Sequence, residues 1–137
     1  MKYAVRYFTR TGNTKKLAEA AAAALGVEAA DVVYKGLDEK TVIVLLGSSL
    51  YAGGFAPDIK AFIEENAEKI GKLAIFGSSA SGKSTYKKIR AFAESKGVSV
   101  IDREFVCPGH FLFMHKERPD ENDLKKVADF ARGIAGI

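Results

Sequence analysis

Short apolar runs recur along the chain and predict five strands. The strongest run, 42–46, is unbroken and typical of a strand that is buried on both faces of a sheet. Four further runs have the length of a strand, and the one at 27–33 is the weakest. The predicted strands therefore cover 2–8, 27–33, 42–46, 72–76 and 98–106.

Between the strands, apolar residues recur at the three- and four-residue spacing of an amphipathic helix. The first such stretch is rich in alanine, a strong helix former, and Gly26 follows it as a C-cap. Pro57 and Pro119 are each followed by an aspartate, a pattern typical of a helix N-terminus. The spacing predicts helices over 14–25 and 83–96, and two more that begin at 57 and at 119–120.

The alternation of strands with helices indicates an α/β fold with one parallel sheet, right-handed crossovers and helices on both faces. We expect a doubly wound five-stranded sheet of order 2-1-3-4-5, with the whole chain, 1–137, forming a single domain. Only a short link separates the second strand from the third. It must cover roughly 20 Å to pass one strand and return along another, and eight extended residues reach about 26 Å. The link therefore fits this order with little or no helix of its own.

A segment rich in hydroxyls and glycine connects the first strand to the first helix. The start of a helix leaves about four N–H groups without an internal partner, and the helix dipole favours an anion there. Threonine hydroxyls add donors, and the segment contains no carboxylate that would repel an anion or hold a metal. We interpret this segment as a pocket for a monophosphate group. It comprises Thr9, Arg10, Thr11, Gly12, Asn13 and Thr14.

Two further loops of small residues, 48–54 and 77–82, follow the third and fourth strands. In the expected order these strands lie beside the first, so all three loops meet at the carboxyl edge, where such sheets bind ligands. Their backbone N–H groups suit the polar edge of a flat heteroaromatic ring. The candidate residues are Ser48, Ser49, Leu50, Tyr51, Ala52 and Gly53 in one loop and Gly77, Ser78, Ser79, Ala80, Ser81 and Gly82 in the other.

Composition narrows the class of protein. The 137 residues carry a formal net charge of +4, with lysines scattered among acids along the helices, so we expect no nucleic-acid binding. No run approaches the roughly 18 apolar residues of a membrane span. The N-terminus shows no signal-peptide pattern, and a single cysteine, Cys107, excludes an internal disulfide. We expect a cytoplasmic protein.

Over essentially its whole length the sequence resembles the flavodoxin family, short-chain type. Residues 9–14 match the family's phosphate loop, which reads hydroxyl, any residue, hydroxyl, Gly, Asn, hydroxyl. The loops at 48–54 and 77–82 fall where flavodoxins enclose the isoalloxazine ring of FMN, and 117–124 is similar to uncharacterised bacterial flavodoxin-domain proteins. The resemblance implies noncovalently bound FMN as cofactor and electron shuttling between redox partner proteins.

The chain departs from typical flavodoxins in two respects. Flavodoxins often stack a tryptophan and a tyrosine on the flavin, whereas this chain has no tryptophan, and Tyr51 is the one aromatic residue inside the second and third loops. Typical flavodoxins are also strongly acidic. Here Lys83, Lys87 and Lys88 follow the third loop, and lysines near a flavin stabilise its anionic reduced form by Coulomb attraction. We therefore expect a less negative potential for the last electron than acidic flavodoxins have.

Three other functions stay open. An FMN-dependent oxidoreductase acting on a quinone or a porphyrinogen would share the fold and the cofactor, and another class keeps the fold but binds no flavin. Residues 77–84 read Gly-x-x-x-x-Gly-Lys-Ser, the pattern of a nucleotide-binding P-loop. Few residues follow that pattern for the rest of a nucleotidase core, and the segment 9–14 would then have no role.

Other chemistries that this sheet order can host are disfavoured by particular residues. A phosphorelay receiver domain needs carboxylates where Thr9 and Ser48 stand, and a low-molecular-weight tyrosine phosphatase needs a cysteine in the first loop. Cys107, His110 and His115 match no standard metal-ligand spacing. A packed thiol and two loop histidines are the simpler interpretation.

Overall fold

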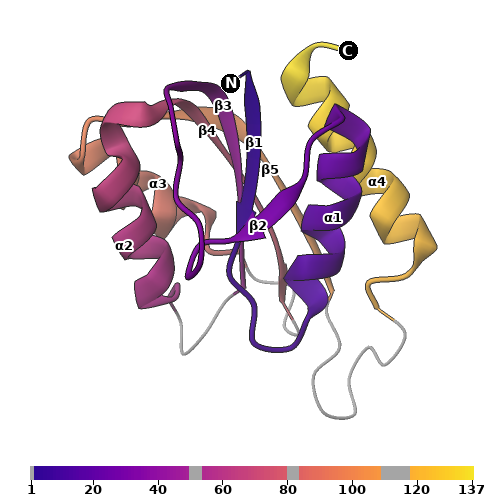
Figure 1. Ribbon diagram of the computed structural model, residues 1–137. Coiled ribbons are helices and arrows are strands. Elements are labelled where there is room, and N and C mark those ends of the chain that lie inside the picture. The colour runs from indigo at the N-terminus through magenta and orange to yellow at the C-terminus, as the bar shows by residue number, and fades with distance from the viewer. Residues whose placement is uncertain (1, 50–53, 80–83, 109–117) are drawn as a thin grey trace.

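The computed structural model describes residues 2–49, 54–79, 84–108 and 118–137 (Figure 1). Strands and helices alternate along this part of the chain. The strands are β1 (Tyr3–Tyr7), β2 (Ala29–Asp31), β3 (Thr41–Ser49), β4 (Ile70–Ser79) and β5 (Ser99–Pro108). The helices are α1 (Asn13–Leu25), α2 (Pro57–Asn66), α3 (Tyr86–Ser95) and α4 (Glu121–Ala135), with a short 3₁₀ helix, η1 (Ala67–Lys69).

The strands form one parallel sheet of order β2-β1-β3-β4-β5. Helices α1 and α4 cover one face, and α2 and α3 cover the other (Figure 1). The predicted doubly wound fold and its strand order are confirmed. Because the strands are parallel, their carboxyl ends and the N-termini of the helices that follow lie at one edge, the lower edge in Figure 1.

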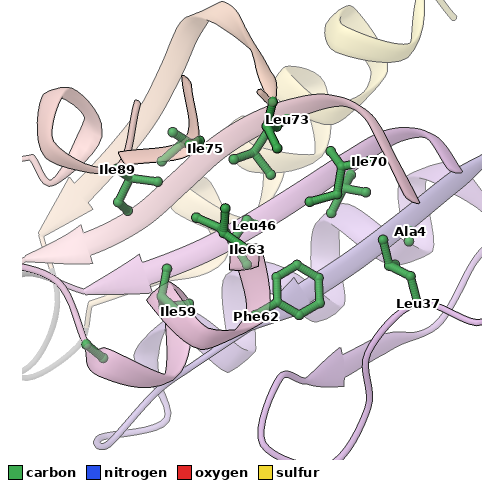
Figure 2. Close-up of a cluster of buried hydrophobic side chains, with 14 residues drawn as sticks. Ala4, Leu37, Leu46, Ile59, Phe62, Ile63, Ile70, Leu73, Ile75 and Ile89 are labelled. Carbon is green, nitrogen blue, oxygen red and sulfur yellow. The ribbon is translucent and has the colours of Figure 1, made fainter. Parts of the chain in front are cut away.

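Side chains alternate between the two faces along the central strands. In β4, Leu73 and Ile75 pack toward α2 and α3, whereas Ala74 and Phe76 pack toward α1 and α4. Figure 2 shows the buried apolar side chains on the face covered by α2 and α3, where side chains of α2 lie against the sheet. From residue 44 onward β3 is buried on both faces, as its apolar run predicts, whereas Val42 near the amino edge is exposed.

The link from β2 to β3 contains no helix, as predicted, and polar side chains hold it in place. Arg6 in β1 is buried and donates from Nε to the carbonyl oxygen of Gly36 at 3.1 Å. Asn66 Oδ1 accepts the N–H of Leu37 at 2.9 Å, and Lys69 Nζ donates to the Leu37 carbonyl oxygen at 3.0 Å. Burial lowers the pKa of Arg6, and the charge of Asp38 opposes that shift. These bonds anchor the link across β1.

Strands β3 and β4 each continue past their predicted ends at 46 and 76. Ser48 pairs with Gly77 and Ser49 with Ser78, so the parallel ladder extends into the small-residue segments. Ser79 in turn pairs with Pro108 of β5. These serines and Gly77 are therefore strand residues rather than loop residues, because neighbouring strands supply partners that their low strand propensity does not predict.

Two other boundaries differ from prediction for local reasons. Strand β2 starts later than 27, because the N–H of Val27 bonds to the Ala22 carbonyl oxygen at 3.0 Å as part of the C-cap of α1. Helix α3 starts at Tyr86 rather than at 83, because Ser84 Oγ accepts the Tyr86 N–H at 2.9 Å in a turn that precedes the helix.

The backbones of β3 and β4 approach closely at Gly77. A Cβ atom on Gly77 would lie 1.9 Å from the carbonyl oxygen of Ser48. A Cβ atom on Gly47 would lie 2.7 Å from the ring of Phe76 and 2.8 Å from Thr14 Cγ2. These distances leave no room for a side chain, so both positions require glycine for packing rather than for backbone conformation.

We expect Gly77→Ala to lower the free energy of unfolding by more than about 2 kcal/mol, because β3 and β4 must separate to admit the methyl group. Gly133→Ala in α4 is the control, since a Cβ there would meet only the end of the flexible Arg103 side chain, at 3.0 Å. Alanine favours the helix, so we expect that variant to stay within about 1 kcal/mol of the wild type. Urea denaturation measures both changes, and a Gly77→Ala protein as stable as the wild type would contradict the packing described.

Candidate functional site

The carboxyl ends of β1, β3 and β4 meet around the start of α1. Thr14 Oγ1, in the first turn of α1, lies 2.7 Å from Ser49 Oγ and 3.2 Å from Ser78 Oγ. Phe8, just after β1, donates its N–H to the carbonyl oxygen of Gly47 at 3.1 Å. The structure therefore brings the described parts of the three predicted segments together at one edge of the sheet.

A tight turn precedes α1. Thr9 Oγ1 accepts the N–H of Gly12 at 2.9 Å, and Gly12 is in the left-handed region with φ 86°. The hydrogen-bond ladder of the helix begins with the N–H of Lys16, which donates to the Gly12 carbonyl oxygen at 3.2 Å. The N–H groups ahead of Lys16 point out of the helix end. Together with the helix dipole, this geometry favours an anion beside the turn.

The charges near this turn also favour an anion. Residues 9–16 contain no carboxylate, and Arg10, Lys15 and Lys16 are exposed. A helix dipole disfavours lysines in the first turn by about 0.3–1 kcal/mol each. An anion bound at the helix start would offset that cost. Helix α3 also lacks acidic residues in its first turn, whereas α2 and α4 carry them there.

The predicted site residues differ in exposure. Arg10 and Thr11 are exposed, and Thr9 and Gly12 are partly buried. The buried ones are Asn13, Thr14, Ser48, Ser49, Gly77, Ser78 and Ser79. Leu50, Tyr51, Ala52, Gly53, Ala80, Ser81 and Gly82 lie outside the described residues, so their part in the site stays a prediction.

Among the described residues, hollows lie at opposite edges of the sheet. One of about 10 Å³, room for about one water molecule, lies between the ends of β3 and β4 and the residues Ser84 and Thr85. A wider recess of about 210 Å³ lies between 40–42 and 68–71, at the amino ends of β3 and β4. Ligands of parallel α/β sheets bind at the carboxyl edge, where helix N-termini supply donors. The wider recess therefore does not define the candidate site.

The P-loop pattern at 77–84 does not form a nucleotide-binding arrangement in the part that the structure describes. Helix α3 begins at Tyr86, beyond the lysine and serine of the pattern. Ser84 Oγ accepts the Tyr86 N–H at 2.9 Å and donates to Glu104, so its proton and one of its two lone pairs are engaged within the chain. A P-loop instead needs that hydroxyl to hold a metal ion. Lys83 lies outside the described residues.

An ion pair fixes the chain where α4 begins, beside the end of β5. Arg118 donates to both carboxylate oxygens of Asp123, with Nη2 2.7 Å from Oδ1. Asp123 also accepts the N–H of Asp120 at 2.9 Å, and Asp120 Oδ1 accepts the N–H of Asp123 at 2.9 Å, which completes a capping box. The sequence interpretation missed this pair, although two aspartates three residues apart after Pro119 are a capping signal.

Cys107 lies next to this ion pair and is buried. Burial, assisted by the charge of Asp123, raises the pKa of the thiol to about 12. The thiolate, which is the form that attacks or binds metal, is therefore scarce at neutral pH. Among the described residues, no three His, Cys, Asp or Glu side chains are placed to hold a metal ion. His110 and His115 lie outside them.

We expect Asp123→Asn to lower the free energy of unfolding at neutral pH by about 1–3 kcal/mol, because Arg118 loses its carboxylate and α4 loses part of its cap. Hydrogen bonding from Arg118 lowers the pKa of Asp123 in the folded protein. The ionised Asp123 carboxylate thus adds its full share to the free energy of unfolding above the ordinary aspartate pKa of about 3.9. That share is lost as the pH falls through the pKa of Asp123 in the folded protein.

Urea denaturation between about pH 7 and pH 3 tests this dependence. The difference in free energy of unfolding between Asp123→Asn and the wild type should stay constant down to about pH 5 and shrink below about pH 4. Asp129→Asn is the control, because Asp129 pairs with Arg132 on the exposed side of the same helix and contributes less than about 1 kcal/mol. A gap that widens as the pH falls would contradict the assignment.

The fold and the position of the candidate site define a class of protein. A five-stranded parallel sheet of order 2-1-3-4-5, with a hydroxyl-rich turn leading from the first strand into the first helix, is the arrangement of a flavodoxin-like protein. A family model described as a flavodoxin domain matches residues 4–115. The chain belongs to the flavodoxin-domain family.

Individual proteins are similar to this chain in sequence or in structure. Uncharacterized protein MJ0298 of Methanocaldococcus jannaschii aligns over 135 residues at 28% identity, covering 89% of each chain. A solved flavodoxin from the domain Archaea has a TM-score of 0.81 at 22% identity, covering 99% of this chain and 97% of that one. Flavodoxin 1 from Bacillus cereus has a TM-score of 0.73 at 17% identity, covering 99% and 98%. These two structures show the shared fold.

Proposed function

We propose that the protein binds FMN noncovalently and carries electrons between redox partner proteins. The observation that carries the proposal is the meeting of the first turn of α1 with the ends of β3 and β4, in a chain of the flavodoxin-domain family. The turn at 9–12 and the start of α1 would hold the phosphate, and the segments that follow β3 and β4 would flank the ring. Bound FMN would supply the redox chemistry.

The described residues fit a phosphate monoester. The turn offers helix N–H groups, exposed cations and threonine hydroxyls, without a carboxylate in 9–16. Because Thr9 Oγ1 accepts the Gly12 N–H, its own proton is left to donate to a ligand. The Thr11 side chain is exposed on the same turn. A monophosphate needs donors and positive charge but no metal ion, and this donor set matches that need.

An electron carrier agrees better with these residues than a substrate-specific oxidoreductase does. The described candidate residues at 9–14, 48–49 and 77–79 present hydroxyls, amides and one guanidinium, but no carboxylate, imidazole or thiol. A general acid or base for a quinone or porphyrinogen substrate would need such a group. Electron transfer to and from a bound flavin needs none from the protein.

The partner's docking surface is expected to be acidic. Lysine pairs occupy the first turns of α1 and α3, Lys15 with Lys16 and Lys87 with Lys88, and both turns lie at the edge that carries the candidate site. Complementary charge across an interface speeds association and selects partners.

None of the helices in the described part of the chain has the length and apolar character to cross a membrane. A cytoplasmic location stays a prediction.

We expect Thr11→Asp to weaken FMN binding by at least about 100-fold, because a carboxylate near the phosphate adds several kcal/mol of repulsion. Binding of riboflavin, which lacks the phosphate, should change little. Ser99→Asp is the matched control, since Ser99 is exposed at the amino end of β5 and receives the same charge far from the turn. Quenching of flavin fluorescence measures all of these affinities. Unchanged FMN affinity in Thr11→Asp would contradict a phosphate site at this turn.

We expect the double variant Lys87→Gln, Lys88→Gln to make the potential for the last electron more negative, by an amount on the order of tens of millivolts. The cause is the loss of two positive charges at the start of α3, on the edge where the flavin would lie. The control variant Lys2→Gln, Lys72→Gln removes the same charge at the amino edge of the sheet, where the N–H of Ile43 bonds to the Lys2 carbonyl oxygen and Lys72 pairs with Ser99. Redox titration of the FMN-loaded proteins measures both. A shift of equal size in the two variants would contradict a local effect.

A further inference from the structure

A buried positive charge lies in β1, on the face of the sheet that α2 and α3 cover. Arg6 is 3% exposed, and it lies two positions after Ala4, which belongs to the buried cluster on this face. Its guanidinium donates from Nε to the carbonyl oxygen of Gly36 at 3.1 Å and from Nη1 to that of Val5 at 3.0 Å. Both acceptors are neutral. The two hydrogen bonds therefore hold the guanidinium without neutralising its charge.

No carboxylate among the described residues forms an ion pair with Arg6. The charge of Asp38 acts on it, yet the Asp38 side chain is 75% exposed and lies 4.0 Å from Lys35 Nζ. Asp123, which is also buried, instead has the guanidinium of Arg118 as a direct partner. Burying a charge without a counter-ion is costly. An anion at the neighbouring edge of the sheet would offset part of that cost.

Arg6 lies near the edge of the sheet that carries the candidate site. It pairs with Leu46 of β3 in the parallel ladder, and β3 ends three residues later at Ser49. Thr9 of the predicted phosphate turn likewise follows three residues after Arg6. Three residues of a strand span about 10 Å. At that distance, with an effective dielectric constant of about 20, one unit charge changes an equilibrium that creates another charge by roughly tenfold.

We propose that the buried charge of Arg6 raises the redox potential of bound FMN by stabilising the reduced flavin relative to the oxidised flavin. The inference rests on the proposed function. Reduction adds two electrons and one proton to the ring, so the neutral ring becomes an anion while the phosphate keeps its charge. The electrons come from the reduced redox partner and the proton comes from water. Because the phosphate is the same in both states, its attraction to Arg6 cancels in the comparison.

Salt separates this buried charge from the surface lysines at the start of α3. Lys87 and Lys88 are exposed, whereas Arg6 is buried. Exposed charges are screened beyond about 3 Å in 1 M salt, and buried charges are screened much less. The contribution of Arg6 to the stability of the reduced flavin should therefore persist at high salt, while that of the two lysines fades.

Anaerobic calorimetry with oxidised FMN and with dithionite-reduced FMN, at low and high salt, tests the proposal. Arg6→Gln removes the charge and keeps a donor for the Gly36 carbonyl oxygen, and Arg6→Met replaces it should the glutamine variant not fold. We expect the uncharged variant to weaken binding of reduced FMN about five- to tenfold more than binding of oxidised FMN, at both salt concentrations. Arg6→Lys keeps the charge and should keep the wild-type ratio of the two affinities.

Lys2→Gln is the matched control, because it removes one exposed charge just before the amino end of β1 and should leave that ratio unchanged. A wild-type ratio in the uncharged Arg6 variant, or an equal loss in Arg6→Lys, would overturn the proposal. A wild type that bound neither form of FMN would refute the proposed function and this inference with it. FMN binding with an unchanged ratio would refute the inference alone.

Discussion

The backbones of β3 and β4 lie closer together at their carboxyl ends than any side chain at Gly77 would allow. The carbonyl oxygen of Ser48 occupies the space that a Cβ at this position would need. This approach brings Ser49 and Ser78 within reach of a single side chain, Thr14, and the absent side chain of Gly47 leaves room for its methyl group. The start of α1 is thereby fixed above three strand ends, and the candidate site depends on that position.

The charge distribution at the carboxyl edge of the sheet depends on the residues in the first turn of each helix. Helices α2 and α4 start with acidic residues, the usual complement to a helix dipole, and α4 adds a capping box closed by Arg118. Helices α1 and α3 start without acids and carry lysine pairs instead. They follow the first and fourth strands, whose ends carry the predicted phosphate turn and one ring-flanking segment. Positive potential therefore gathers where an anionic cofactor would lie.

Much of the fold could be predicted from the sequence, because its signals are local. Unbroken apolar runs gave the central strands, helical spacing gave the helices, and the shortness of the β2–β3 link was compatible with the strand order. The ends of β3 and β4 could not be found in this way. Serine and glycine have low strand propensity, and only pairing across the sheet, such as Ser49 with Ser78, extends the strands through them.

The candidate site was predicted in outline and not in detail. The position of the turn at 9–12 beside the other two segments follows from topology. The burial of Thr14 follows from the helical period, which places it on the buried face of α1 with Leu17. The ion pair of Arg118 with Asp123 was missed because the sequence indicates the helix cap but not that the Arg118 side chain folds back to donate to the Asp123 carboxylate. Side-chain direction needs the packed structure.

Titration of ¹⁵N-labelled protein with FMN, followed by amide resonances in NMR spectra, tests the central claim most directly. A phosphate bound at the start of α1 shifts the amide signals of the N–H groups that donate to it. We expect the largest shifts at residues 12–15, with smaller ones at the ends of β3 and β4. Largest shifts at 84–88, at the start of α3, or no shifts at saturating FMN, would contradict a phosphate site in the first turn.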